Sequence, residues 1–177
     1  MNIIIPKILV DPETYKGRPL FFLAGPLRGA GDWQKPMAEL LEREVPDAVI
    51  AIPQRYDSSH PLHRLVMEGQ KDAFSRQLAW EEHYLQTAST SGGVIFWLGT
   101  QKEPRDDDEP YAMDTRREIG EWPIRAKYEP GVKLFIGAEP GFYGLDQIER
   151  SLHRVLGDSF IIHSSMESLV QAAALRP

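Results

Sequence analysis

The chain has 177 residues, of which 42% are hydrophobic and 26% are charged, and its formal net charge is −6. This length and composition predict one soluble domain over residues 1–177, with a core that needs neither disulfides nor a metal. The net negative charge argues against a nucleic-acid polymer as partner, whereas one local site can still bind a small nucleoside or nucleotide.

Cysteine is absent, which excludes disulfides, thiolate catalysis and cysteine-ligated zinc. The apolar run near the N-terminus is too short for a signal peptide, and no window approaches the roughly 20 apolar residues of a membrane-spanning helix. We therefore expect a cytoplasmic protein without a membrane partner.

The N-terminal third of the chain predicts an arm, a strand, a turn and a helix. Residues 1–18 mix β-branched residues with proline and glycine, which indicates an irregular N-terminal arm. Residues 19–24 are a continuous apolar run, typical of a strand buried on both faces. A glycine-rich turn at residues 25–32 then leads into a helix that carries Trp33. Such a turn allows a ligand to approach the backbone closely.

The middle of the chain continues this alternation. Residues 48–52 predict a second strand, and residues 54–68 predict a long polar connection. A helical period over residues 70–88 carries Gln77, Glu81 and Glu82. The strongest strand signal of the chain follows at residues 94–98.

The C-terminal part begins with a polar loop at residues 99–113, which enters a helix bearing Glu118. This helix is predicted to reach about residue 127, unless Pro123 kinks it or ends it early. The remaining elements are a strand at 132–136, a helix at 145–156, a strand at 160–162 and a helix at 165–175.

These elements predict an α/β fold, namely a flavodoxin-like or Rossmann-like doubly wound sheet of five parallel strands in a three-layer α/β/α arrangement. In such a fold ligands bind at the carboxyl ends of the strands, where the strand order reverses. The turn at Gly25 and Pro26 and the segment 99–118 should therefore flank one crevice.

A nicotinamide cofactor is not expected. Gly25, Gly29 and Gly31 are spaced G-x-x-x-G-x-G, which is not the dinucleotide-binding fingerprint, and no acidic residue stands out after the second strand. An NAD dehydrogenase is therefore rejected, and no other cofactor is indicated.

Metal binding is not expected either. His60 and His63 have a spacing that suits a metal on a helical turn, but Pro61 lies between them and no fixed carboxylate is expected nearby. The acidic run at residues 106–109 lacks the central glycine and the spaced ligands of a calcium loop, so it is interpreted as a solvated loop.

Glu118 has two interpretations. Thr115 and Glu118 have the spacing of a capping box, with Asp114 or Thr115 as N-cap, and the glutamate then only satisfies a backbone N–H. In the other interpretation Glu118 points into the crevice. The two exclude one another, because a side chain folded back onto its own helix start cannot face a ligand.

Three segments stand out in order: FFLAGP at residues 21–26, QLAWE at 77–81 followed by VIFW at 94–97, and TRREIG at 115–120. Together they resemble segments of the nucleoside 2-deoxyribosyltransferases and their relatives. The resemblance covers roughly residues 19–137.

The resemblance implies an enzyme that cleaves or exchanges the N-glycosidic bond of a nucleoside or nucleotide, without cofactor or metal. Glu118 matches the family's nucleophile, which attacks C1′ of the sugar. Glu81 matches an acidic residue that faces the pocket, and it is the expected acid for the leaving base. The expected substrate-binding residues are Phe22, Gly25, Pro26, Trp97, Tyr111 and Asp114.

Phe22, Trp97 or Tyr111 would stack on the base, although Trp97 also suits a core position. Relatives assemble as dimers or larger oligomers, so a homo-oligomer is expected. The aromatic residues expected to be exposed, and to suit an interface or a pocket lid, are Tyr111, Trp122, Phe142 and Tyr143.

Two positions depart from the family pattern. Members commonly have Asp or Ser six residues before the nucleophile, where this chain has Ala112. Phe21 stands where some transferases carry a tyrosine. The alternative function is therefore a non-catalytic nucleotide-binding or sensing module that kept the fold and lost the chemistry.

Overall fold

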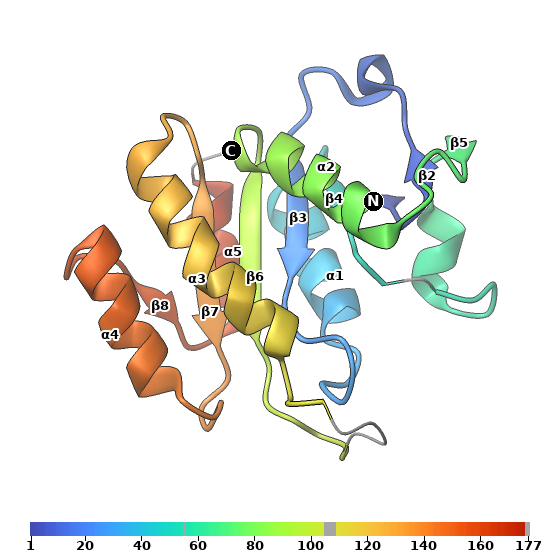
Figure 1. Cartoon of the computed structure of the whole chain (residues 1–177). Helices are drawn as coiled ribbons and strands as arrows, with labels where there is room; N and C mark the ends of the chain where they lie inside the picture. The colour runs from blue at the N-terminus through green and yellow to red at the C-terminus, as the bar shows by residue number, and fades with distance from the viewer. Residues whose placement is uncertain (55, 105–108, 176–177) are drawn as a thin grey trace.

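The computed structural model describes residues 1–54, 56–104 and 109–175. Its centre is a parallel sheet of six strands in the order β1-β4-β3-β6-β7-β8 (Figure 1). The strands are β1 (Asn2–Ile4), β3 (Leu20–Ala24), β4 (Val49–Ala51), β6 (Gly93–Leu98), β7 (Leu134–Ala138) and β8 (Ile162–His163).

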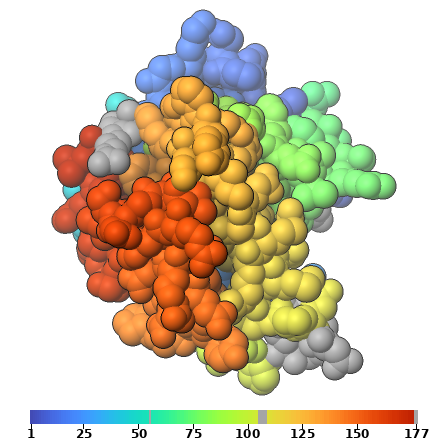
Figure 2. All heavy atoms as spheres, turned by 60° about the vertical axis from the view of Figure 1, so that its left-hand side comes forward, coloured from blue at the N-terminus to red at the C-terminus, as the bar shows by residue number. Residues whose placement is uncertain are grey.

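Helices cover both faces of the sheet, which gives the predicted three-layer α/β/α, Rossmann-like architecture (Figure 1). One face carries α1 (Gln34–Glu44) and α5 (Met166–Ala174), which pack against each other. The other face carries α2 (Gln77–Ser89), α3 (Met113–Tyr128) and α4 (Leu145–Leu156). These three helices follow one another across the molecule, with α4 packed beside α3 (Figure 2).

The central strands are buried because both of their faces are covered. Every residue of β3 and β6 is buried. Along β6 the side chains alternate between the two layers, so that Phe96 packs towards α2 and α3 while Trp97 packs towards α1 and α5. Continuous apolar runs are the expected sequence of such strands.

The N-terminal residues differ from the predicted arm, and the sheet has six strands where five were expected. Residues Asn2–Ile4 form β1, which pairs in parallel with β4 through Ile3 and Ile50 and through Ile4 and Ala51. Ile3 and Ile4 are fully buried. A three-residue edge strand is too short to show a clear period in the sequence.

The helix predicted from residue 70 begins later than expected. Gln70–Lys71 form the short strand β5, which pairs antiparallel with β2 (Ile8–Leu9), and α2 starts only at Gln77. Short 3-10 helices at Pro12–Tyr15 and Pro61–Leu65 lie in the connections. Pro123 does not end α3, which continues to Tyr128.

The strand order reverses between β3 and β6. The chain runs from β3 through α1 to β4 on one side of β3, and β6 lies on the other side. The loops after β3 and β6 therefore leave the sheet side by side, which is the expected position of a ligand site. Within the described part of the chain, no helix is long and apolar enough to cross a membrane.

Candidate active site

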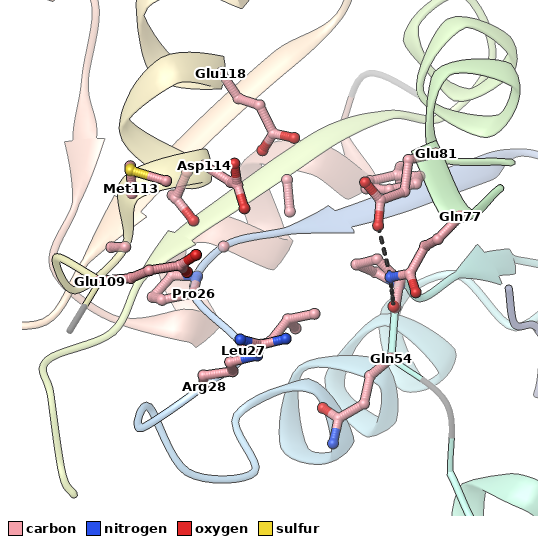
Figure 3. Close-up of a pocket in the computed structure, with 16 residues that line it drawn as sticks. Pro26, Leu27, Arg28, Gln54, Gln77, Glu81, Glu109, Met113, Asp114 and Glu118 are labelled. Atoms are coloured by element: carbon pink, nitrogen blue, oxygen red, sulfur yellow. Dashed lines mark hydrogen bonds between the residues drawn. The ribbon is translucent and has the colours of Figure 1, made fainter. Parts of the chain in front are cut away.

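A cavity of about 800 Å³ opens at the carboxyl ends of β3 and β4, between the first turns of α2 and α3 (Figure 3). This size is within the usual range for small-molecule sites. The cavity is lined by Phe22, Ala24, Gly25, Pro26, Leu27, Arg28, Pro53, Gln54, Gln77, Glu81, Glu109, Ala112, Met113, Asp114, Thr115 and Glu118.

Only glycine fits at the turn that begins the cavity wall. Gly25 has φ +153°, and a Cβ at this position would lie 2.4 Å from the Trp97 carbonyl oxygen and 2.8 Å from Cζ2 of Trp33. The Trp33 indole N–H donates to the Pro26 carbonyl at 2.7 Å. The turn therefore packs closely against Trp97 of β6 and is held by Trp33 at the start of α1, which gives the cavity a rigid wall.

The capping-box interpretation of Glu118 is wrong. Helix α3 begins at Met113, its N-cap is Ala112 with φ 59° and ψ 30°, and no side chain caps it. Thr115 is a buried residue of the first turn and not the N-cap. The Glu118 side chain instead points into the cavity (Figure 3).

Glu118 is a carboxyl group held among other negative charges. Burial is the main cause that raises its pKa to about 7, and the charges of Glu81, Asp114 and Glu121 add to the effect, while Arg117 opposes it. In the described part of the chain, no hydrogen bond or ion pair joins its carboxylate. Glu118 therefore changes protonation state near neutral pH.

Glu81 faces the same cavity from α2 (Figure 3). Burial raises its pKa above the ordinary range, whereas a hydrogen bond from Gln77 lowers it, and Asp114 and Arg117 act in opposite directions. That bond runs from Gln77 Nε2 to Glu81 Oε1 at 2.8 Å. The fold thus brings together the two carboxylates that the resemblance singled out.

The wall on the α3 side carries two further acidic residues, Asp114 and Glu109. Arg28, on the loop after β3, lines the side of the cavity across from Glu118 (Figure 3). The predicted residues Phe22, Gly25 and Pro26 form the rest of that side and the floor. Four carboxylates around one cavity favour a substrate that becomes positively charged during reaction.

Two predicted substrate-binding residues do not line the cavity. Trp97 is 3% exposed and belongs to the core layer of α1 and α5, on the opposite face of the sheet from Phe22. Tyr111 donates its hydroxyl to the Gly99 carbonyl at 2.7 Å and packs against Phe142. Trp97 therefore lies in the core, which was the other predicted position for this residue.

The lining residues that were not predicted from the sequence as ligand contacts include Arg28, Gln54, Gln77 and Met113. Arg28 lies within the glycine-rich turn, and Gln54 directly follows the second strand and Pro53. Both positions are at carboxyl ends of strands, which is the signal that would have indicated them. Gln77 and Met113 are lining residues through their places in the first turns of α2 and α3.

Two aromatic residues expected at the surface are buried instead. Trp122 and Phe142 are each 3% exposed, because they pack between α3, α4 and the sheet. Tyr143 is 86% exposed, as expected. Arg125 lies over the Trp122 ring, and Arg116 lies over the Phe142 ring.

The expectation that no carboxylate lies near the histidines is wrong. His60 Nε2 lies 3.0 Å from Asp32 Oδ2, and its ring stacks on Tyr56 at 4.0 Å. Its Nδ1 accepts from the Leu62 N–H. His60 thus joins the loop after β4 to the loop after β3.

Among the residues described, no cluster of three metal-ligating side chains occurs. Of the acidic run at 106–109, residues 106–108 lie outside the described residues.

No protein-family model matches the chain, and no curated protein is significantly similar to it. The fold and the cavity define the class of protein. It is a Rossmann-like α/β protein with an acidic cavity at the reversal of strand order.

Proposed function

We propose that this protein cleaves or exchanges the N-glycosidic bond of a nucleoside or nucleotide, with Glu118 as the nucleophile. One observation carries this proposal: Glu118 and Glu81, from two different helices, point into one cavity at the strand-order reversal. The resemblance of TRREIG at residues 115–120 to the nucleophile segment of nucleoside 2-deoxyribosyltransferases supports the same roles.

The proposed reaction has two steps, and each needs both carboxyl groups. In the first, a Glu118 oxygen bonds to C1′, the bond between C1′ and the base nitrogen breaks, and Glu81 gives a proton to the leaving base. In the second, water or another base attacks C1′ and passes a proton to Glu81, while the ester bond to Glu118 breaks. Transfer and hydrolysis differ only in which nucleophile takes part in the second step.

The electrostatics of the cavity suit this chemistry. The transition state resembles an oxocarbenium ion, and ionised carboxylates close to it stabilise the positive charge. With its pKa at about 7, Glu118 is ionised in part of the molecules at neutral pH, and this ionised form is the proposed nucleophile.

The space beside the carboxylates suits a sugar and a base. The floor is formed by Phe22, which is 2% exposed, and by Ala24, so that one side is apolar. Metal or cofactor chemistry is not part of the proposal, because the two carboxyl groups supply both nucleophile and proton donor.

The second candidate function is nucleotide binding without turnover. Ala112 lines the cavity with only a methyl group at the position where the resembling enzymes commonly carry Asp or Ser. Asp114 lines the same wall, on the first turn of α3. If the protein is catalytic, we assign the sugar contact to Asp114. Removing the Asp114 carboxylate should then weaken turnover.

The test is base release from a panel of deoxynucleosides, ribonucleosides and their 5′-monophosphates, followed by chromatography. The proposal expects release from at least one substrate and a loss of at least about 10³-fold in the Glu118→Gln variant. Binding of a panel member without base release would favour the non-catalytic module. Undiminished release by the variant would reject Glu118 as the nucleophile.

A further inference from the structure

The Gln77 side chain connects two walls of the cavity. Its Nε2 donates one hydrogen bond to the Pro53 carbonyl at 2.9 Å and one to Glu81 Oε1 at 2.8 Å (Figure 3). Pro53 follows β4, whereas Gln77 and Glu81 lie on the same face of α2, one turn apart. The amide therefore ties the Glu81 carboxylate to the end of a sheet strand.

The orientation of this amide follows from its partners. The Pro53 carbonyl can only accept a hydrogen bond, so the amide nitrogen, and not the amide oxygen, must face it. The nitrogen has two hydrogens, and the second one is directed at Glu81. The Glu81 oxygen in this contact must be an acceptor, which favours the ionised carboxylate over the protonated acid.

Other groups around Glu81 act in both directions. Burial and the Asp114 charge on α3 disfavour the ionised form, whereas Arg117 favours it. Glu118 faces the same space and its charge and that of Glu81 repel one another. Gln77 is the neutral donor that offsets part of this burial and repulsion.

We propose that Gln77 is a positioning residue, whose amide, anchored on the Pro53 carbonyl, holds the Glu81 carboxylate in the cavity and favours its ionised form. The catalytic consequence rests on the proposed function. In the second step the attacking water or base bonds to C1′, the bond from C1′ to Glu118 breaks, and ionised Glu81 takes the proton of the nucleophile. Gln77 should therefore assist the second step more than the first.

Two matched substitutions separate this role from a general effect of cavity polarity. Gln77→Met keeps the length of the side chain and removes its donor. Gln54→Met makes the same change at a second lining glutamine, for which the described part of the chain shows no hydrogen bond to Glu81 or Glu118. Gln77→Asn, which is one methylene too short to reach both partners, serves if Gln77→Met does not fold.

The measurement is the ¹³C titration of the Glu81 side-chain carboxyl by NMR, assigned through its disappearance in Glu81→Gln. The proposal expects the midpoint to move to higher pH in Gln77→Met, or in Gln77→Asn, and to stay as in the wild type in Gln54→Met. An unchanged midpoint in the Gln77 variants would overturn the proposal, and so would an equal displacement in Gln54→Met.

Turnover gives a second readout. If the proposed function holds, Gln77→Met should lower base release at neutral pH by about 10- to 100-fold, and pre-steady-state assays should show a burst of base followed by slow turnover. An equal slowing of both steps would contradict the role in the second step. The titration needs no turnover, so failure of the proposed function and failure of the Gln77 assignment are distinguished.

Discussion

Glu81 and Glu118 face one cavity from two helices, and the charge of Glu81 raises the pKa of Glu118. A single sheet holds both helices, because α2 precedes β6 and α3 follows it. The pair is therefore a product of the fold and not of sequence proximity.

The first prediction concerns the pH dependence of base release. Glu118 must be ionised to attack C1′, so kcat/KM should rise with pH through a midpoint at about 7. Glu81→Gln removes a neighbouring negative charge, so the midpoint should move to lower pH although the rate falls. Because Glu81 must be protonated in the same step, kcat/KM should fall again where Glu81 loses its proton. A profile without a rising limb near pH 7 would contradict Glu118 as the ionised nucleophile.

The second prediction concerns stability. The pKa of Glu118 is about 7 in the folded chain and has an ordinary value of 4.5, so the folded state binds this proton more tightly than the unfolded state does. Its contribution to stability is therefore greatest below pH 4.5 and is lost as pH rises to about 7. Glu118→Gln has no carboxyl group to titrate at this position. Between pH 5 and pH 8 its free energy of unfolding should therefore rise by roughly 2 kcal/mol relative to that of the wild type.

Urea unfolding at several pH values measures this difference. The matched control is Glu149→Gln, which makes the same change at an exposed carboxylate of α4. If the free energy of unfolding depended on pH in the same way in Glu118→Gln and in the wild type, this result would contradict a buried Glu118.

The third prediction concerns the glycine turn. Gly25→Ala would place a methyl group 2.4 Å from the Trp97 carbonyl and should lower the free energy of unfolding by roughly 2–4 kcal/mol. Gly120 lies within α3, where a Cβ meets nothing within 4 Å, so Gly120→Ala should raise stability by about 0.5–1 kcal/mol. Thermal unfolding of both variants checks the contrast, and a stable Gly25→Ala variant would refute the close approach.

The fourth prediction is a homo-oligomer. The Tyr143 side chain is 86% exposed, and such a residue suits a contact between copies. Sedimentation velocity should show a dimer or larger species, and Tyr143→Ser should shift the distribution towards monomer. A wild-type monomer at all concentrations would contradict this expectation.

The sequence predicted the layers of the fold well where apolar runs are long. Strands β3 and β6 were evident because their residues are buried on both faces. Strand β1 was not, since its three residues give no period, and its pairing with β4 is a contact over a long distance in sequence. The pairing of β5 with β2 likewise could not be predicted from neighbouring residues in the sequence, so the predicted helix at residues 70–88 began too early.

The candidate site was predicted in part. Topology placed Gly25 and the segment that carries Glu118 at one edge of the sheet, and the family resemblance added Glu81. All three residues line the cavity. The start of α3 was misjudged, because a left-handed Ala112 has no distinct sequence signal and the capping-box spacing pointed to a later start. Trp97 was misplaced for another reason, since a strand buried on both faces does not reveal which face each side chain takes.

The most direct test of a glutamate nucleophile is to trap its ester. A nucleoside with fluorine at C2′ destabilises the oxocarbenium-like transition state and should slow the breakdown of the intermediate. After incubation, mass spectrometry of the digested protein should find one fluorodeoxyribosyl group on Glu118, and none in Glu118→Gln. Base release without a covalent adduct, or an adduct on another residue, would contradict the account.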